Sequence, residues 1–504
     1  MRCFQLGRRS AFPALAAVFL TAACAAARSR PATTARPQSH AERELVSDLS
    51  RLFGAEVMGQ GMWGIEVRSM ESGAVLYELN SRKLMMPASN MKIVTLATAA
   101  ETLGWDYRFT TTIETAAPVE AGTLAGDLVV RGGGDPTINK RGGRAAAVFD
   151  QWADALTSAG IVRIDGRIIG DDNAFDDATL GGGWAWDYLQ YGYAAPIGAL
   201  EFNESIATLT VRPGARLGDP VFVDLTPGTG LRLVNRAVTA AAGSPITIDY
   251  DRRSDGPVLE VNGSLPMDAA PVERDVAVVN PTAYFARAVK DALVARGIDV
   301  TGDAVDADDV LDAPPPDARR PLAGWQSPPL CEIATVLMKV SQNLYAETLL
   351  KAVGAAKGGL GTTEGGRVAT RALLASWGVP DSSYVQMDGS GLSRYDYLTP
   401  DLIVTILEHL YRSPAHRDAF IATLPIAGRD GTISTRMKNT RAENNASAKT
   451  GSIANVRSLS GYVRTRDGEV LAFSILANNF TIPSSTVNWI ADLAVETLAD
   501  FSRR

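Results

Sequence analysis

The pattern of hydrophobic and polar residues changes character twice along the chain of 504 residues. In the first part, helical spacing of apolar residues over 41–53 predicts a helix, and alternating runs at 63–68 and 75–78 predict two strands. An almost continuous apolar segment from Ile93 to Gly104 then predicts a buried helix. This first part therefore combines helix with sheet.

From about residue 110 to residue 276, short β-rich runs replace the long helices. Runs at 128–131, 163–169 and 207–212 are rich in β-branched residues, and Gly and Pro separate them. Only 145–159 has the spacing of a long amphipathic helix. The stretch predicts one or two largely β modules inserted into a parent domain.

Helical spacing returns after residue 280, and the rest of the chain combines helices with strands. The turn at 466–468 suits a tight hairpin between two of the strands. Terminal helices that flank an antiparallel sheet predict an α+β parent domain. The elements predicted here are helices over 330–339, 344–353 and 485–499, and strands over 445–450, 458–465 and 469–477.

The composition adds size and charge to this outline. Hydrophobic residues make up 46% of the chain and charged residues 21%, as in soluble globular proteins, and the length suits two or three domains. A formal net charge of −7 argues against nucleic acid as a partner. Only nine of the 49 basic residues are lysines. A lysine at a motif position is therefore informative, because lysine can lose its proton at working pH and arginine cannot.

The first 27 residues are predicted to be a signal peptide, which implies an exported protein of the periplasm or cell envelope. Basic residues precede an apolar run over 11–27 that is short for a membrane span. The segment at Arg8 and Arg9 resembles a twin-arginine signal, and the segment that ends at Cys24 resembles a lipoprotein cleavage box. The export route and a lipid anchor or peripheral membrane association therefore stay open. Residues 28–40 predict a disordered linker.

One motif stands at the start of the predicted buried helix. Ser89 and Lys92 form the only Ser-x-x-Lys in the chain. Side chains three residues apart on a helix project from one face, so the amine can reach the hydroxyl. A neutral, desolvated lysine is a competent base for a serine nucleophile. The alternative is that Ser89 caps a core helix and Lys92 is solvated.

Two further motifs complete a proton path. Ser341 and Asn343 belong to the only Ser-x-Asn in the chain, and Lys449 begins its only Lys-Thr-Gly. In acyl transfer, Ser89 would attack a carbonyl while Lys92 takes its proton. Ser341 would bridge Lys92 and Lys449 and pass the proton to the leaving amine, and Asn343 would hold the substrate backbone.

The Lys-Thr-Gly segment has the chemistry of a carboxylate site. Lys449 and Thr450 would bind the terminal carboxylate of the substrate through charge-assisted hydrogen bonds. Gly451 would leave the strand open to close approach. The oxyanion would lie between the backbone N–H groups of Ser89 and Ser452.

Other hydrolytic schemes fit the sequence poorly. The only histidines are His40, His409 and His416, the first in the predicted linker and the others on or just after a predicted surface helix. A Ser-His-Asp triad therefore lacks a placed base. No His, Cys and carboxylate cluster with metal-ligand spacing is present, so no metal and no cofactor is expected.

The order Ser-x-x-Lys, Ser-x-Asn, Lys-Thr-Gly resembles that of the penicillin-recognising serine acyl-enzymes, which are penicillin-binding proteins and serine β-lactamases. The long separation of Ser89 from Ser341 exceeds what a compact β-lactamase needs. From about residue 41 onward the chain resembles the class C low-molecular-mass penicillin-binding proteins of the penicillin-binding protein 4 type. These are the D-alanyl-D-alanine carboxypeptidase/endopeptidases of peptidase family S13. The similarity includes segments 132–137, 184–187, 388–394, 424–428 and 447–452.

This resemblance implies a penicillin-binding/β-lactamase-like catalytic domain that carries nested inserts. It implies hydrolysis of terminal D-Ala-D-Ala bonds and D-Ala-diaminopimelate cross-links in peptidoglycan stem peptides, with β-lactam antibiotics as covalent inhibitors. The division that we expect is a catalytic domain over 41–109 and 277–504, a β-rich insert over 110–140 and 205–276, and a second insert over 141–204.

The resemblance also implies a pocket for the diaminopimelate side chain. Arg394, and with less support Asp171 and Phe175, would line it. Ala454 stands where a relative of this family has glutamine, which is a departure from the pattern.

Two alternative functions remain at this point. A serine β-lactamase would need a deacylating glutamate, and Glu201-Phe202-Asn203 lacks the expected glutamate two residues earlier, where Ala199 stands. A non-catalytic cell-wall-binding relative would not need all three motifs intact. The oligomeric state and the balance of carboxypeptidase and endopeptidase activity are not predicted.

Overall fold

The computed structural model describes residues 39–253, 256–356 and 358–504. The predicted signal peptide and the predicted linker up to residue 38 lie outside the described residues. Helix α1 (His40–Phe53) begins one residue earlier than predicted, because Ser39 caps it. The Ser39 hydroxyl accepts from Glu42 N at 3.1 Å, and the Glu42 carboxylate accepts from Ser39 N at 2.7 Å.

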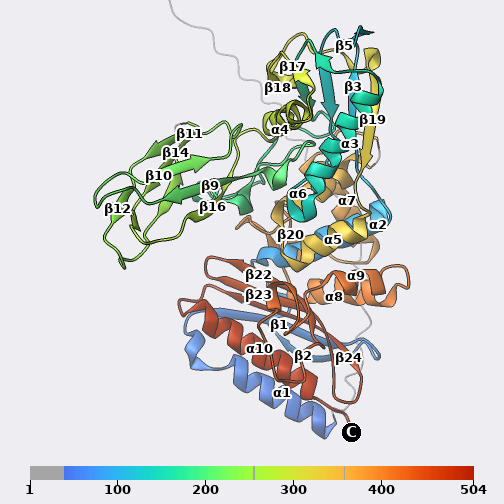
Figure 1. Cartoon of the computed structure of the whole chain (residues 1–504). Coiled ribbons are helices and arrows are strands. Elements are labelled where there is room, and N and C mark those ends of the chain that lie inside the picture. Colours follow the sequence, from blue (N-terminus) through green and yellow to red (C-terminus); the bar gives the residue numbers. More distant parts are fainter. Residues whose placement is uncertain (1–38, 254–255, 357) are drawn as a thin grey trace, which may run out of the picture.

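A five-stranded antiparallel sheet in the order β2-β1-β24-β23-β22 brings the two ends of the described chain together (Figure 1). Alternate residues of β24 point to opposite faces of this sheet. Phe473 and Ile475 pack against α1 and α10, whereas Ala472 and Leu476 pack against the layer that contains α8. The predicted α+β class is confirmed. The bounds are β1 (Met62–Ser69), β2 (Val75–Leu79), β22 (Ser447–Ile453), β23 (Val456–Arg464), β24 (Val470–Asn478), α8 (Pro400–Arg412) and α10 (Ser484–Asp500).

A layer of helices covers the other face of the sheet and contains the predicted buried helix, α2 (Met91–Leu103). Every residue of α2 from Met91 to Ala100 is buried. The helices predicted over 330–339 and 344–353 are confirmed as α5 and α6. The remaining elements of this layer are α5 (Leu330–Lys339), α6 (Asn343–Ala355), α7 (Thr363–Ser376), α9 (Arg417–Thr423), β20 (Tyr384–Val385) and β21 (Tyr397–Leu398).

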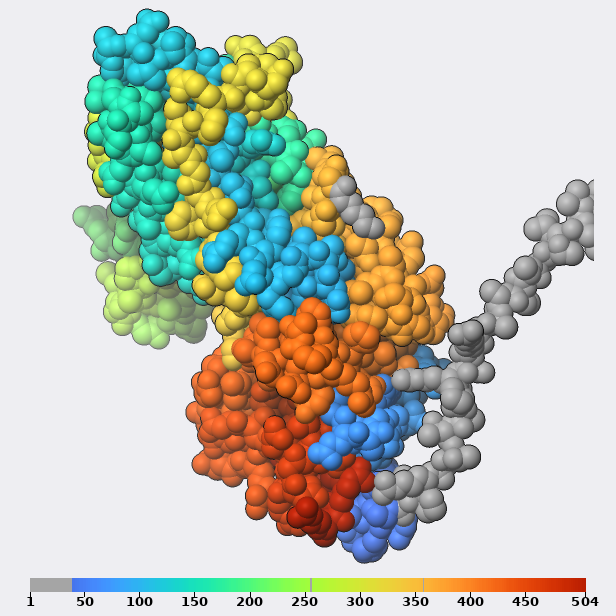
Figure 2. Space-filling model, turned by 90° about the vertical axis from the view of Figure 1, so that its right-hand side faces the viewer, coloured from blue at the N-terminus to red at the C-terminus, as the bar shows by residue number. Residues whose placement is uncertain are grey.

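An insert at the far end of the molecule has two sheets, β18-β8-β6-β3-β19 and β17-β7-β5-β4, with α3 and α4 packed in the same apolar cluster. Figure 2 shows its cyan and yellow segments together at the end opposite the red C-terminal residues. The bounds are β3 (Thr110–Thr115), β4 (Val119–Glu120), β5 (Thr123–Leu124), β6 (Leu128–Arg131), α3 (Arg144–Ser158), β7 (Arg163–Ile164), β8 (Ile168–Asp171), α4 (Pro281–Ala295), β17 (Asp299–Val300), β18 (Ala304–Asp306) and β19 (Arg320–Gln326).

A smaller all-β module begins with β9 and projects sideways from this insert (Figure 1). Its apolar cluster joins residues of several short sheets. The bounds are β9 (Ile206–Arg212), β10 (Phe222–Leu225), β11 (Arg232–Asn235), β12 (Val238–Ala240), β13 (Asp249–Arg252), β14 (Val258–Asn262), β15 (Ser264–Pro266) and β16 (Val272–Ala277).

The strand pairings differ from the segment boundaries that we expected from the sequence. β19 pairs with β3, and β17 and β18 pair with β7 and β8, so 299–326 shares sheets with 110–171 instead of returning to the parent domain at 277. The strands of 206–277 pair among themselves and not with β3 to β8. The all-β module is therefore the inner insertion, and 141–204 is not.

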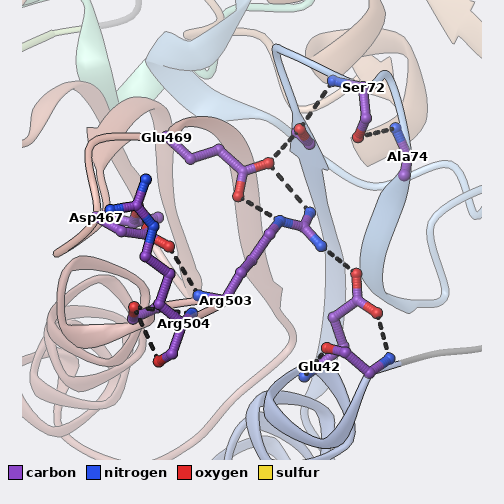
Figure 3. Close-up of polar contacts among 11 residues, drawn as sticks. Glu42, Ser72, Ala74, Asp467, Glu469, Arg503 and Arg504 are labelled. Carbon is purple, nitrogen blue, oxygen red and sulfur yellow. Dashed lines mark hydrogen bonds and ion pairs between the residues drawn. The ribbon is translucent and has the colours of Figure 1, made fainter.

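Arg503 connects the C-terminal residues to the N-terminal helix α1 (Figure 3). Its guanidinium donates to Glu469 at 2.7 and 3.1 Å and also forms an ion pair with Glu42 of α1. Its backbone N–H donates to Asp467 at 2.8 Å. Within the described residues, no helix combines the length and hydrophobicity that crossing a membrane requires.

Candidate active site

The Ser-x-x-Lys motif lies where a short 3-10 turn, η2 (Ala88–Asn90), leads into α2. The Nζ atom of Lys92 is 2.9 Å from Ser89 Oγ, as the helical spacing predicted. Asn90, which is buried, donates its side-chain amide to the carbonyl of Lys449 at 3.0 Å. This bond joins the turn that carries Ser89 to strand β22, which carries Lys-Thr-Gly.

Lys92 has two further partners, both of them acceptors. Its Nζ is 2.6 Å from Asn343 Oδ1 and 2.8 Å from the carbonyl oxygen of Ser390. Burial lowers the pKa of Lys92 to about 7, against the opposing effect of the nearby carboxyl groups of Asp388, Glu347 and Asp396. A neutral amine has two N–H donors and one lone pair. In this neutral form the two acceptors take both donors, so the lone pair is directed to the hydroxyl of Ser89, whereas the ammonium form donates to all three oxygens.

The two side chains of the Ser-x-Asn motif contact different lysines. Lys449 Nζ is 2.7 Å from Ser341 Oγ, whereas Lys92 contacts Asn343. Of the two contacts predicted for Ser341, the one with Lys449 is present. At Lys92 the contact is made by the amide of Asn343 instead. Ser341 has a positive φ of 62°, which turns the chain between α5 and α6. Burial lowers the pKa of Lys449 well below its usual range, and the charge of Lys92 lowers it further.

Strand β22 runs close to the nucleophile at Gly451. A Cβ atom on Gly451 would lie 2.9 Å from Ser89 N, 2.7 Å from the Pro87 carbonyl oxygen and 2.1 Å from Ser458 Oγ. Only glycine lets the strand approach Ser89 in this way. The hydroxyl of Thr450 is 2.7 Å from that of Thr432.

One cavity of about 420 Å³ lies over these groups, and the predicted site residues that line it are Ser89, Ser341, Asn343, Thr450 and Ser452. The structure thus brings together residues from all three motifs. Several lining residues were not predicted from the sequence, and they come from the insert, from the loops after β20 and α9 and from the end of β22. They are Tyr188, Tyr193, Gly391, Leu392, Thr432 and Ile453.

Tyr193 matters because its carbonyl oxygen accepts from Asn343 Nδ2 at 2.7 Å. Every residue has a backbone carbonyl, so a sequence pattern does not show which carbonyl a side chain contacts. The cluster of aromatic residues at Tyr188, Tyr191 and Tyr193 was the one available signal.

The residues predicted for a side-chain pocket do not lie together. Arg394 donates to the carbonyl of Ala454, which lines the cavity, at 3.1 Å. Asp171 is buried in an ion pair with Arg319, and Phe175 is buried in the core. Neither Asp171 nor Phe175 is among the described residues that line the cavity.

The histidines have partners elsewhere. His416 accepts from Trp105 Nε1 at 3.1 Å and lies 3.2 Å from a carboxylate oxygen of Glu101. His409 stacks on Trp377 with ring centroids 4.0 Å apart. In the described parts of the chain, the carboxylates close enough to share a metal ion are Asp172, Asp306 and Asp308, and none of them lines the cavity.

The fold and the site define a serine hydrolase of the penicillin-recognising class. Residues 45–498 match the D-Ala-D-Ala carboxypeptidase 3 (S13) family, and the chain belongs to that family. It is 35% identical over 474 residues to a D-alanyl-D-alanine carboxypeptidase of Actinomadura sp. (strain R39), covering 91% of this chain and 85% of the relative. It is 26% identical over 427 residues to the D-alanyl-D-alanine carboxypeptidase DacB of Haemophilus influenzae, covering 83% and 85%.

The fold is also that of a solved structure. The crystal structure of penicillin binding protein 4 (dacB) from Haemophilus influenzae superposes with a TM-score of 0.78 at 24% identity, covering 90% of this chain and 99% of that one. The family resemblance drawn from the three motifs is confirmed.

Proposed function

We propose that this protein is a D,D-peptidase that releases the terminal D-alanine from peptidoglycan stem peptides and also cleaves D-Ala-diaminopimelate cross-links. The observation that carries the proposal is the set of contacts around Lys92, in which two acceptors leave the lone pair for Ser89. The names of the relatives, which are D-alanyl-D-alanine carboxypeptidases, support the substrate class.

Acylation follows from this geometry. Ser89 Oγ bonds to the carbonyl carbon of the penultimate D-alanine, and its proton passes to Lys92. The negative oxygen is held by the backbone N–H groups of Ser89 and Ser452. When the C–N bond breaks, the leaving amine receives a proton from the hydroxyl of Ser341, which Lys449 replenishes across their 2.7 Å contact.

Lys449 and Thr450 would hold the substrate carboxylate, with Thr432 beside them. A bound carboxylate favours the ammonium form of Lys449, so it reverses the effect that burial has on the pKa of this lysine in the free enzyme. Water then hydrolyses the acyl-enzyme after the leaving amine has departed. Because the substrate is cell-wall material, we propose that the protein acts after export, in the periplasm or cell envelope.

The lining of the cavity favours a peptidase over a β-lactamase. Among the described residues that line it, none carries a carboxylate that could activate water against a penicilloyl ester. A β-lactam keeps its leaving group tethered, so the penicilloyl-enzyme should persist while peptides turn over.

The test is labelling with a fluorescent penicillin, followed by mass mapping of the modified peptide over time. Ser89 should carry the adduct, and Ser89→Ala should lose both labelling and D-alanine release. Ser72→Ala, an exposed serine in the turn between β1 and β2, is the matched control and should behave as the unaltered protein. Labelling of the Ser89 variant at another serine, or rapid multiple turnover of penicillin without an adduct, would contradict the proposal.

A further inference from the structure

The peptide group between Ser390 and Gly391 connects Lys92 to a carboxylate that it does not touch. The carbonyl oxygen of this peptide accepts from Lys92 Nζ at 2.8 Å. The N–H of the same peptide donates to Asp388 Oδ1 at 2.6 Å. Hydrogen bonds at the two ends of one peptide group polarise each other in the same direction. A negative charge on Asp388 therefore makes the Ser390 carbonyl a stronger acceptor for Lys92.

The position of this peptide is fixed by its neighbours. Gly391 has a φ of +81°, and a Cβ on it would lie 1.8 Å from the Ala88 carbonyl oxygen. The loop thus packs directly against the turn that carries Ser89. Glu347 of α6 holds the preceding residues, since its two carboxylate oxygens accept from Gly389 N and Ser390 N, both at 2.8 Å.

Three buried carboxyl groups surround this loop. Asp388 also accepts from Ser393 N at 2.8 Å and from Trp184 Nε1 at 2.9 Å. Asp396 accepts from Met387 N at 2.6 Å through one oxygen. Glu347, Asp388 and Asp396 are each at most 1% exposed, and so is Lys92. Near neutral pH only about half of the Lys92 side chains carry a positive charge, because their pKa is about 7. Ionising all three buried carboxyl groups beside this lysine would therefore cost a large amount of free energy.

The hydrogen bonds indicate which group carries a proton. Both oxygens of Asp388 and both oxygens of Glu347 receive donors, as carboxylates require. The second oxygen of Asp396 is buried and has no partner among the described residues, and the carboxyl group of Asp388 is its neighbour. A protonated Asp396 would donate to Asp388. Burial, and next the charge of Asp388, raise the pKa of Asp396 well above its usual range.

We propose that Asp388 is the remote counter-charge of Lys92, acting through the Ser390–Gly391 peptide group, and that Asp396 carries a proton which it donates to Asp388. The inference rests on the proposed function, in which Lys92 becomes an ammonium when it takes the proton of Ser89. Asp388, Asp396 and Asn343 are positioning residues in this arrangement. The titratable groups that face Lys92 are Asp388 and Asp396 from the loop, Glu347 from α6 and Lys449 from β22.

The test measures the acid limb of the pH profile for acylation by a fluorescent penicillin. Asp388→Asn removes the counter-charge, so the Lys92 ammonium becomes less stable and the midpoint should fall by about one pH unit, with a lower maximum rate. If Asp388 only supports the loop, its loss admits water, relieves the burial of Lys92 and raises the midpoint. A midpoint that rises or stays in place overturns the proposal.

Asp396→Asn separates the two parts of the inference. An amide can accept from Met387 N and donate to Asp388, as the protonated acid does, so the midpoint should stay where it is. A midpoint that moves as far as in Asp388→Asn overturns the assignment of the proton.

Infrared spectroscopy gives a measurement that does not depend on activity or on the folding of Asp388→Asn. Burial raises the pKa of Glu201 and Glu347 as well, so the comparison is a difference spectrum at neutral pH. Relative to the unaltered protein, Asp396→Asn should lose one carbonyl band of a buried protonated carboxyl group. An unchanged spectrum overturns the assignment. Labelling of Ser89 in the unaltered protein tests the proposed function itself, so a labelled Ser89 together with an unshifted Asp388→Asn profile refutes only the present inference.

Discussion

The rate at which Ser89 is acylated should depend on pH in a way that reports the environment of Lys92. Only the free amine can accept the proton of Ser89, so the rate must rise as the pH passes the pKa of Lys92 and level off above it. Burial lowers this pKa from 10.5 to about 7, although Asp388, Glu347 and Asp396 oppose the change.

The size of the effect follows from that value. With a pKa of about 7, the free-amine fraction is about one-tenth at pH 6 and about nine-tenths at pH 8, so the rate rises about tenfold and reaches a plateau. A lysine that keeps the ordinary value of 10.5 would give a rise of about a hundredfold over the same interval, with no plateau below about pH 10. The two cases differ both in slope and in shape.

Stopped-flow measurement of the second-order acylation constant, with a β-lactam that does not titrate in this range, provides the assay. Circular dichroism at each pH should verify that the fold is unchanged. Lys92→Ala should lose acylation almost as completely as Ser89→Ala, because both belong to one catalytic unit. Lys83→Ala, which removes an exposed lysine, should keep the profile. A hundredfold rise without a plateau, or a rate independent of pH, would refute the assignment of Lys92 as the base.

Three further predictions concern other parts of the molecule. Gly451→Ala should slow acylation by about five- to a hundredfold, because overpacking of about 1–3 kcal/mol pushes β22 away from Ser89, whereas Gly324→Ala, with its nearest contact at 3.7 Å, should have no effect. Lys449→Gln removes both the carboxylate contact and the proton source for Ser341, so acylation by peptides with a free carboxylate should fall about ten- to a hundredfold more than acylation by their amides; equal losses would exclude carboxylate binding. Arg503→Ala should lower the free energy of unfolding in urea by about 1.5–3 kcal/mol, because Glu469 and Glu42 lose the contact with its guanidinium, and Arg504→Ala should not.

Local spacing predicted the parts of the site that local geometry determines. Ser89 and Lys92 are neighbours because they lie one turn apart, and the predicted helices and strands of the parent domain follow from their periodicity. The pairing of β19 with β3 joins Arg320 to Thr115 across the whole inner module. Nothing in the spacing of either segment encodes such a long-range pairing, so the insert boundaries were predicted wrongly.

The assignment of Asp171 had a different weakness. It came from the family resemblance alone. In the structure the Asp171 carboxylate forms an ion pair with Arg319, a residue of the segment that was expected to belong to the catalytic domain. One oxygen of this buried carboxylate is paired with Arg319 and the other accepts from Asn173, so little capacity is left for a substrate.

Asn343 shows how the insert and the catalytic domain act together. Its amide oxygen contacts Lys92, and its amide nitrogen donates to the carbonyl of Tyr193 in the insert. An amide that turned over would place its nitrogen against the Lys92 amine and its oxygen against the Tyr193 carbonyl, losing both hydrogen bonds. The carbonyl of Tyr193 thus holds Asn343 in the orientation that presents an acceptor to Lys92. The direction of the Lys92 lone pair depends on that acceptor. Through Tyr193 and Asn343, the insert therefore helps to orient the proposed catalytic base.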